Sequence, residues 1–192
     1  MIPDKCLAKL CQEAYEKHSW SKDGTELLVR LGEGNITIAF RGTTFNGLDI
    51  LKDMRATPWW NSELGGWFHH GFLRGALNAR EYVEPLVQTT KLPVILTGHS
   101  KGGAEAQILA MLLAKKVGDL KVVTFGSPRV GFNQAQKLLA NVSCTLYRNG
   151  IDAVTQVPTI LPWKHAVPLK TLYAQSKDRF GNHRIREYVQ AL

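Results

Sequence analysis

The sequence has few of the features that mark several large classes of protein. Its 192 residues include only three cysteines, at positions 6, 11 and 144, and no CxxC pair, so a disulfide framework is not expected. Reduced thiols fit a cytoplasmic protein best. No apolar run approaches the ~20 residues that span a bilayer, and no internal repeat or low-complexity tract occurs. With a hydrophobic content of 44%, these absences predict one globular domain over residues 1–192.

The start of the chain lacks the basic stretch and apolar block of a secretion signal. Instead, apolar residues recur at helical spacing, which predicts an N-terminal helix over residues 1–20; they are Leu7, Leu10, Cys11 and Tyr15. We therefore expect a cytoplasmic location. Release by lysis, inside a virus particle or through a dedicated secretion system are the alternatives.

Acidic residues are scarce in the second half of the chain. Residues 101–192 hold 13 Lys and Arg against 5 Asp and Glu, whereas residues 1–100 hold 11 of each, so the whole net charge of +8 lies in the second half. A solvated basic surface explains this excess, and so does peripheral contact with an anionic membrane. Nucleic acid is not expected as a partner, because no zinc-finger spacing, RNP-like signature or GxxxxGK[ST] loop occurs.

Strand-like and helix-like segments alternate along the chain. Short apolar runs, two of them ending in glycine, are typical of buried parallel strands; the strands are predicted at 35–40, 92–98, 120–126 and 142–150, with further edge strands at 26–31 and 166–173. Helices are predicted at 71–88, 101–116 and 131–140, and a closing helix over 182–192. This order predicts an α/β fold with a mostly parallel sheet and helices on both faces. Ligands of such sheets bind outside the carboxyl ends of the strands.

One motif stands at such a carboxyl end. Gly98-His99-Ser100-Lys101-Gly102 fits G-x-S-x-G, with a predicted strand before it and a predicted helix after it. In that context the motif forms a sharp turn that lifts the serine hydroxyl above the sheet, and glycine on either side avoids collisions. The motif predicts that Ser100 is a nucleophile. The alternative is a glycine-rich turn that packs closely or binds a phosphate.

A serine nucleophile needs a base and an orienting acid. Asp152 directly follows the fourth predicted strand and so falls at the same sheet edge as Ser100. Asp119 precedes a strand, which places it at the opposite edge, and Asp178 is a second candidate. A structural acid in a loop is the alternative role for Asp152.

Two histidines follow the serine in the sequence. His183 stands at the start of the closing helix, where its side chain can reach inward, and is favoured as the base. His165 precedes an edge strand and is more typical of a structural residue. The adjacent pair His69 and His70 is poorly spaced for one zinc ion, so neither a metal nor another cofactor is expected.

Six segments in a fixed order carry a resemblance to a known family; they read "IAFRGTTFNGLDILKDM", "HHGFLRGA", "VILTGHSKGGAEAQILAMLLA", "VVTFGSPRVG", "YRNGIDAVTQVP" and "NHRIREYV". The chain resembles the class 3 lipases, the α/β-hydrolase family related to fungal triacylglycerol lipases. The resemblance implies an α/β-hydrolase fold without a cofactor, with Ser100 as nucleophile, Asp152 as acid and His183 as base. It also matches the His165 segment to a histidine that is not catalytic.

The same resemblance assigns "FRGTT" to an oxyanion loop. Thr43 would donate from its backbone, and the N–H of Lys101 would be the second donor. Asp53 would support the loop, and a surface acid is the equal alternative. Lys101 also places a cation near the site, where it could favour anionic head groups.

Residues 55–70 occupy the lid position as a short loop rich in tryptophan, so a minimal lid is expected. Trp59, Trp60 and Trp67 fit a partial cover or acyl-binding wall, insertion at a lipid interface, or a packed loop that fills the edge of the core.

The sequence thus predicts a serine hydrolase of carboxylic esters, acting on lipid esters that are either glycerides or phospholipids. An acyltransferase would use the same triad with an alcohol in place of water. The contrasting hypothesis is a catalytically silent hydrolase fold that binds anionic membranes. The oligomeric state has no signature in the sequence.

Overall fold

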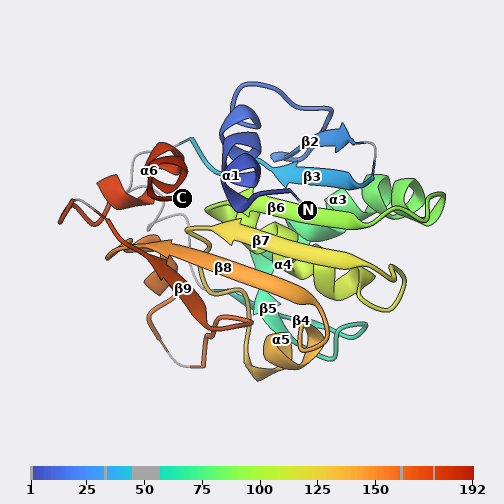
Figure 1. Ribbon diagram of the computed structural model, residues 1–192. Helices are drawn as coiled ribbons and strands as arrows, with labels where there is room; N and C mark the ends of the chain where they lie inside the picture. Colours follow the sequence, from blue (N-terminus) through green and yellow to red (C-terminus); the bar gives the residue numbers. More distant parts are fainter. Residues whose placement is uncertain (1, 33, 45–56, 161, 175) are drawn as a thin grey trace.

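A seven-stranded sheet runs through the centre of the molecule, in the order β1-β2-β3-β6-β7-β8-β9 (Figure 1). The computed structural model describes residues 2–32, 34–44, 57–160, 162–174 and 176–192. The sheet strands are β1 (Trp20–Lys22), β2 (Thr25–Leu31), β3 (Ile36–Phe40), β6 (Val94–His99), β7 (Leu120–Phe125), β8 (Ser143–Asn149) and β9 (Leu169–Leu172). The α-helices among these residues are α1 (Asp4–Glu13), α3 (His70–Gln88), α4 (Lys101–Leu113), α5 (Asn133–Leu138) and α6 (Ile185–Ala191).

The sheet is mostly parallel, as the alternation of strands and helices predicts. β3, β6, β7, β8 and β9 pair in parallel, and β1, β2 and β3 pair antiparallel. The strands predicted at 35–40, 92–98, 120–126 and 142–150 are confirmed within one or two residues. The strand predicted at 26–31 exists but is not an edge strand, because the three-residue strand β1 covers it.

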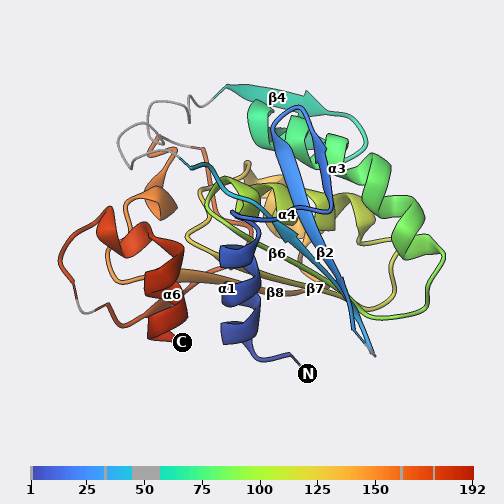
Figure 2. The same ribbon diagram turned by 90° about the horizontal axis from the view of Figure 1, so that it is seen from above.

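The alternation of side chains along the strands divides the core into two layers. In β6, Leu96 belongs to the large cluster formed with α3 and α4. The preceding residue, Ile95, points to the other face, where it packs with Leu7 of α1 and Tyr188 of α6. Figure 2 shows α1 and α6 on one side of the sheet and α3 and α4 on the other. Helices on both faces, as predicted, leave the carboxyl ends of the strands as the edge where a site can form.

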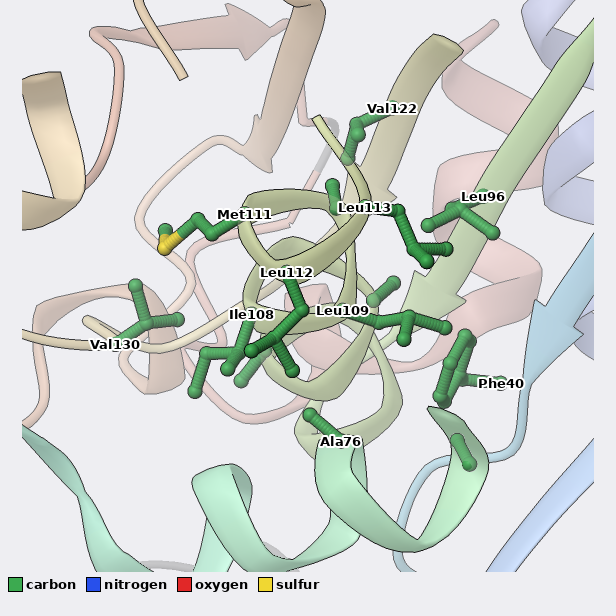
Figure 3. Packing of buried hydrophobic residues seen from close by; sticks show 14 of the residues in the cluster. Phe40, Ala76, Leu96, Ile108, Leu109, Met111, Leu112, Leu113, Val122 and Val130 are labelled. Atoms are coloured by element: carbon green, nitrogen blue, oxygen red, sulfur yellow. The ribbon is translucent and has the colours of Figure 1, made fainter. Parts of the chain in front are cut away.

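Helix α4 is the most deeply buried helix of the described structure. Every residue from Gly102 to Leu113 in it is buried. Ile108, Leu109 and Leu112 reach into the cluster that also contains Phe40 and Leu96 (Figure 3). A helix that is buried on all sides requires neighbours on all sides, and the sheet and α3 supply most of them. The helix that follows Ser100 is therefore held firmly in place.

The N-terminal helix is shorter than predicted. It covers Asp4–Glu13 rather than residues 1–20, and β1 already begins at Trp20. Leu7, Ala8 and Cys11 form its buried face. Tyr15 continues the helical spacing in the sequence but lies in the turn beyond the helix, where its hydroxyl has a polar partner described below.

Residues 58–69 form a hairpin rather than the loop predicted for 55–70. β4 (Pro58–Asn61) pairs antiparallel with β5 (Gly66–His69). Within this hairpin Phe68 is fully buried, whereas Trp59, Trp60 and Trp67 are 55%, 49% and 44% exposed. The interpretation of these tryptophans as fillers of the core edge is therefore wrong, because Phe68 takes the inward position. Trp60 and Trp67 instead form a cross-strand pair with ring centroids 5.6 Å apart.

Two further findings bear on the compositional expectations. The three cysteine thiols are all free. Within the described ranges, no helix combines the length and the apolar character needed to cross a membrane.

The burial of α4 generates a prediction about stability. Replacing the fully buried Leu109 by alanine leaves a cavity in the main core, so Leu109→Ala should lower the free energy of unfolding by about 3 kcal/mol. Leu31, which is 71% exposed, is the matched control, and Leu31→Ala should change stability by less than about 0.5 kcal/mol. Urea unfolding followed by circular dichroism measures both, and equal losses would contradict this account of the core.

Candidate active site

The G-x-S-x-G segment forms a strained turn between β6 and α4. Ser100 has φ 56° and ψ −127°, a backbone conformation that L-residues rarely adopt. A Cβ on Gly98 would lie 2.4 Å from the carbonyl carbon of Gly102, and one on Gly102 would lie 2.4 Å from the carbonyl oxygen of Phe40. The two glycines are thus required by close backbone approach, which explains the motif as predicted.

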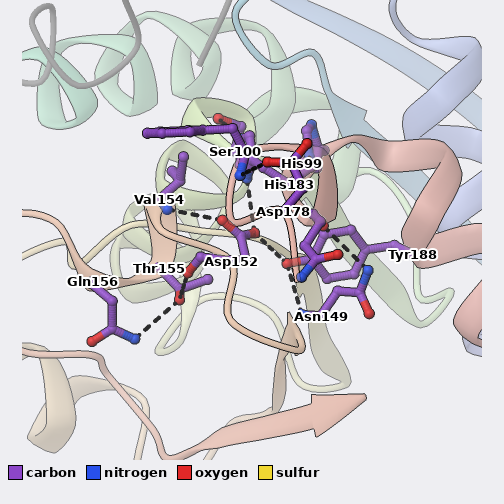
Figure 4. A network of polar contacts seen from close by, with 12 residues as sticks. His99, Ser100, Asn149, Asp152, Val154, Thr155, Gln156, Asp178, His183 and Tyr188 are labelled. Carbon is purple, nitrogen blue, oxygen red and sulfur yellow. Dashed lines mark hydrogen bonds and ion pairs between the residues drawn. The ribbon is translucent and has the colours of Figure 1, made fainter. Parts of the chain in front are cut away.

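Ser100, His183 and Asp152 meet at this turn (Figure 4). His183 Nε2 lies 2.9 Å from Ser100 Oγ, and His183 Nδ1 lies 2.9 Å from Asp152 Oδ2. With Nδ1–H donating to the carboxylate, Nε2 is left to accept the serine proton. Ser100 and Asp152 are fully buried and His183 is 4% exposed, so the polar contacts act with little competition from water. The structure therefore brings together the three side chains predicted from the sequence.

Asp152 lies in the loop after β8 and accepts hydrogen bonds from three directions. Besides His183, the backbone N–H of Val154 donates to Oδ1 at 2.9 Å and the Tyr188 hydroxyl donates to Oδ2 at 2.5 Å. Burial raises the pKa of Tyr188 well above its ordinary value, and the charge of Asp152 adds to the rise, so the hydroxyl stays protonated as a donor. Tyr188 in turn accepts the N–H of Asn149 at 3.0 Å. This network stabilises a buried carboxylate that would otherwise be costly.

Gly126, directly after β7, makes room for the histidine–aspartate pair. Its φ is +61°, and a Cβ there would lie 2.8 Å from Asp152 Oδ2 and 2.9 Å from His183 Nδ1. A larger residue would push into the hydrogen bond between the two side chains. The neighbouring strand thus has to end in glycine for the pair to form.

His99 anchors the backbone of the triad histidine. Its Nε2 lies 2.6 Å from the carbonyl oxygen of His183, and its Nδ1 lies 2.6 Å from the Tyr15 hydroxyl. Burial, aided by the nearby His183, lowers the pKa of His99 well below its ordinary value, so the ring is neutral. The carbonyl can only accept, which makes Nε2–H the donor and Nδ1 the acceptor of the Tyr15 proton. Tyr15 therefore selects the tautomer that holds His183.

The proposed oxyanion donors lie beside the serine. Lys101 is the first residue of α4, so its N–H has no acceptor within the helix. The loop that carries Thr43 packs against the turn, since a Cβ on Gly42 would lie 2.7 Å from the carbonyl oxygen of His99. A depression of about 250 Å³ borders the site, and Thr43 and His183 both line it. Both donors predicted from the resemblance are thus next to the triad.

The Lys101 side chain is already engaged with the protein. Its Nζ donates to the carbonyl of Gly24 at 2.7 Å and lies 3.4 Å from Glu105 Oε1. Glu105 is fully buried against Gly75, where a Cβ would come within 2.1 Å of the same oxygen. Burial raises the pKa of the Glu105 carboxyl to about 7, and the ammonium of Lys101 opposes that rise. The ammonium group is therefore directed to the β1–β2 turn and α4.

The other sequence candidates lie elsewhere. His165 Nε2 bonds the carbonyl of Thr155 at 2.7 Å instead of approaching Ser100, and burial lowers its pKa to about 4. Asp178 accepts the N–H of Phe180 within its own loop. Asp119 directly precedes β7, at the opposite edge of the sheet, as predicted.

The remaining candidates add nothing to the triad. Asp53 lies outside the described residues. His69 stacks on Phe72 with ring centroids 3.9 Å apart, and His70 lies against Trp59. In the part of the chain that the structure describes, no three His, Cys, Asp or Glu side chains are grouped so that they could hold a metal ion.

Sequence reasoning missed the residues that hold the triad in place. Tyr188 lies in the segment "NHRIREYV" and Tyr15 in the helical spacing of the N-terminal residues, but neither pattern points to a polar role, and most of the chain separates them. His99 lies inside G-x-S-x-G at a position where the pattern allows any residue. The sequence did carry a signal for Gly126, because this glycine directly follows the apolar run of the strand predicted at 120–126 and so marks the end of that strand.

Comparison with known proteins gives a consistent result. The sequence model of the family "Lipase (class 3)" matches residues 37–161. The chain is 31% identical over 163 residues to phospholipase A(1) DAD1, chloroplastic, of Arabidopsis thaliana, covering 71% of this chain and 36% of that protein. It is 29% identical over 151 residues to secreted mono- and diacylglycerol lipase 2 of Gibberella zeae, covering 65% and 37%. The chain thus spans little more than a third of the length of these curated relatives.

Solved structures show the same fold. The lipase from Rhizopus microsporus var. chinensis superposes with a TM-score of 0.69 at 26% identity, over 85% of this chain and 62% of that one. The triacylglyceride lipase of Rhizomucor miehei gives a TM-score of 0.70 at 24% identity, over 82% and 65%. The predicted α/β-hydrolase fold is confirmed.

The tether from Tyr15 through His99 to His183 generates a prediction about the reactivity of Ser100. Tyr15→Phe removes the hydroxyl that donates to the buried His99 Nδ1, so His99 should hold the backbone of His183 less firmly. Loss of one neutral hydrogen bond costs about 1 kcal/mol, so the rate at which a fluorophosphonate labels Ser100 should fall about fivefold. Stopped-time labelling with mass-spectrometric mapping measures the rate. Tyr173→Phe, at a side chain 87% exposed, is the matched control. Identical rates in the two variants would contradict the tether.

The raised pKa of Glu105 generates a prediction about stability and pH. The carboxyl ionises near 4.5 when unfolded and near 7 when folded, so its contribution to stability is complete below pH 4.5 and is lost as the pH rises to about 7. The difference in unfolding free energy between wild type and Glu105→Gln should therefore shift by up to about 3 kcal/mol against wild type across this window. Urea unfolding at a series of pH values measures it. A constant difference would show that Glu105 ionises normally.

Proposed function

The chain belongs to the class 3 lipase family, and from this premise we propose that it is a serine hydrolase that cleaves the carboxylic esters of lipids. The observation that carries the proposal is the chain of two 2.9 Å hydrogen bonds from Ser100 through His183 to Asp152. Each partner is buried, and each stands on a segment that the sequence places in a different part of the chain. A structural role alone would not require a strained backbone at Ser100.

In the proposed mechanism, Ser100 Oγ attacks the ester carbonyl carbon while His183 Nε2 takes the hydroxyl proton. The negative charge that develops on the carbonyl oxygen is stabilised by the backbone N–H groups of Thr43 and Lys101. Asp152 stays ionised and stabilises the imidazolium through Nδ1–H. The carbon–oxygen bond to the alcohol then breaks, and His183 returns its proton to the leaving oxygen.

The second half of the cycle releases the acid. His183 removes a proton from a water molecule, whose oxygen attacks the acyl carbon and forms a second tetrahedral intermediate. Collapse of this intermediate breaks the bond to Ser100 and returns the proton to Oγ. If an acceptor alcohol takes the place of water, the same steps transfer the acyl group instead of hydrolysing it.

Lipids are the proposed substrate class because the family to which the chain belongs is a family of lipases. Two relatives bear names of lipid-cleaving enzymes, one for mono- and diacylglycerols and one for phospholipids. The exposed tryptophans of the β4–β5 hairpin suit contact with a lipid surface, since indole rings favour such interfaces. In the described part of the chain, none of the three lines the depression beside His183, so a role as an acyl-binding wall there is not supported.

The proposal predicts hydrolysis of p-nitrophenyl esters that depends on Ser100. Ser100→Ala removes the nucleophile, so kcat/KM should fall by at least about 10³-fold at every acyl length from acetate to palmitate. Ser62→Ala, at an exposed serine of the hairpin turn, is the matched control and should retain full activity.

The contrasting hypothesis of a silent membrane-binding fold makes the opposite prediction. It requires no esterase activity and no fluorophosphonate adduct on Ser100 in the folded wild type, together with binding to anionic vesicles that salt abolishes. That combination of results would overturn the proposed function.

A further inference from the structure

The basic excess of the second half of the chain has no role in the mechanism above. Lys101 was the cation that the sequence placed nearest to the site, but its ammonium binds the Gly24 carbonyl and faces Glu105. The ammonium is thus turned toward the β1–β2 turn, and Lys101 is not among the residues that line the depression beside His183. If the charge acts on the substrate, another cation has to supply it.

Arg184 is a cation that lines the depression itself. It follows His183 directly and lines the 250 Å³ depression together with the triad histidine, Thr43 and Thr44. No Asp or Glu is among the residues that the structure describes around this depression. Among the described residues, an anion that enters it therefore meets a guanidinium group and two threonines and no carboxylate.

The Arg184 side chain is exposed and has no close partner. Its guanidinium makes no hydrogen bond or ion pair with the described residues. Its charge is felt by Asp178, whose pKa is lowered chiefly by the N–H groups of Gly181 and Phe180 and to a smaller extent by Arg184. The Asp178 carboxylate is thus satisfied by its own loop. This leaves the five donors of the guanidinium free for a ligand.

Two further cations near Arg184 add to the positive charge beside the depression. The loop that leads to His183 also carries Lys177 and Arg179, both exposed. A planar guanidinium binds phosphate oxygens in bidentate fashion, and charge-assisted hydrogen bonds of this kind are stronger than neutral ones. The local chemistry therefore suits a phosphodiester better than a neutral head group.

We propose that Arg184 binds the phosphodiester of a glycerophospholipid while Ser100 attacks an acyl ester of the same molecule. In such a lipid only the short glycerol backbone separates the phosphate from the ester carbonyls, so adjacent residues of one loop can serve both groups. The bond that breaks is the acyl ester, and the phosphodiester stays intact. This inference rests on the proposed function and makes Arg184 a determinant of head-group specificity.

The test compares two soluble substrates with the same acyl chains, dibutanoyl phosphatidylglycerol and dibutanoylglycerol, each kept monomeric so that attraction to a charged surface plays no part. In wild type, the ratio of kcat/KM for the phospholipid to that for the diacylglycerol should exceed its value in Arg184→Ala by about tenfold or more, as expected for loss of a hydrogen-bonded charge. Arg184→Lys keeps the charge without the bidentate geometry and should give an intermediate ratio.

Arg186→Ala is the matched control, since Arg186 is exposed, pairs with Glu187 at 3.1 Å and does not line the depression. It should leave the ratio at the wild-type value. An unchanged ratio in Arg184→Ala, or an equal fall in Arg186→Ala, would overturn the inference. A preference for phospholipid that appears only with anionic vesicles, and not with the monomeric substrates, would also overturn it.

Failure of the proposed function would give a different result. If the proposed function is wrong, the wild type will not cleave p-nitrophenyl butanoate, an ester without phosphate, in a manner that depends on Ser100. The inference about Arg184 would then fail as well. Retained cleavage of that ester with an unmoved substrate ratio would overturn the role of Arg184 alone. Circular dichroism of each variant confirms that the fold is intact.

Discussion

The site depends on the absence of two methyl groups. Neither Gly98 nor Gly102 can carry a Cβ, because a Cβ on Gly98 would lie 2.4 Å from the backbone of α4 and one on Gly102 would lie 2.4 Å from the carbonyl oxygen of Phe40 at the end of β3. These close approaches hold the turn at Ser100, whose φ is 56°, between β6 and the start of α4. They also set the loop of residues 41–44 against the turn. Position, backbone donors and nucleophile therefore follow from one steric constraint.

The hydrogen bonds around Asp152 keep a carboxylate charged in the interior of the protein. Asp152 has no exposed surface, and its two oxygens accept from His183, Tyr188 and the N–H of Val154. These donors come from the 3-10 helix at residues 154–156 after β8, from the turn at residue 183 and from helix α6. Because each donor is itself fixed by buried contacts, the imidazole has one orientation. The electrostatics of the site are thus linked through α6 to the core layer that α1 and α6 form on one face of the sheet.

The sequence predicts the parts of the site that obey local rules. The apolar runs identified the parallel strands, and a strand followed by G-x-S-x-G identified Ser100. Chain order and strand position then selected Asp152 and His183. The supporting residues obey no local rule, because Tyr15 and Tyr188 act across contacts between segments far apart in the chain. The hairpin at 58–69 was missed for a similar reason, since its pairing depends on which aromatic side chain finds room in the core.

Residues from both ends of the chain meet at His99. Tyr15 belongs to the segment after the first helix, and the carbonyl that His99 holds belongs to His183, in front of the last helix. The serine turn between them can therefore be complete during synthesis while its base is still missing. The base of Ser100 and the tyrosine that donates to Asp152 thus both depend on the segment from residue 183 to α6. A chain shortened before residue 183 would keep Ser100 but would lack both its base and the side chains of α6 that complete the core layer under the sheet.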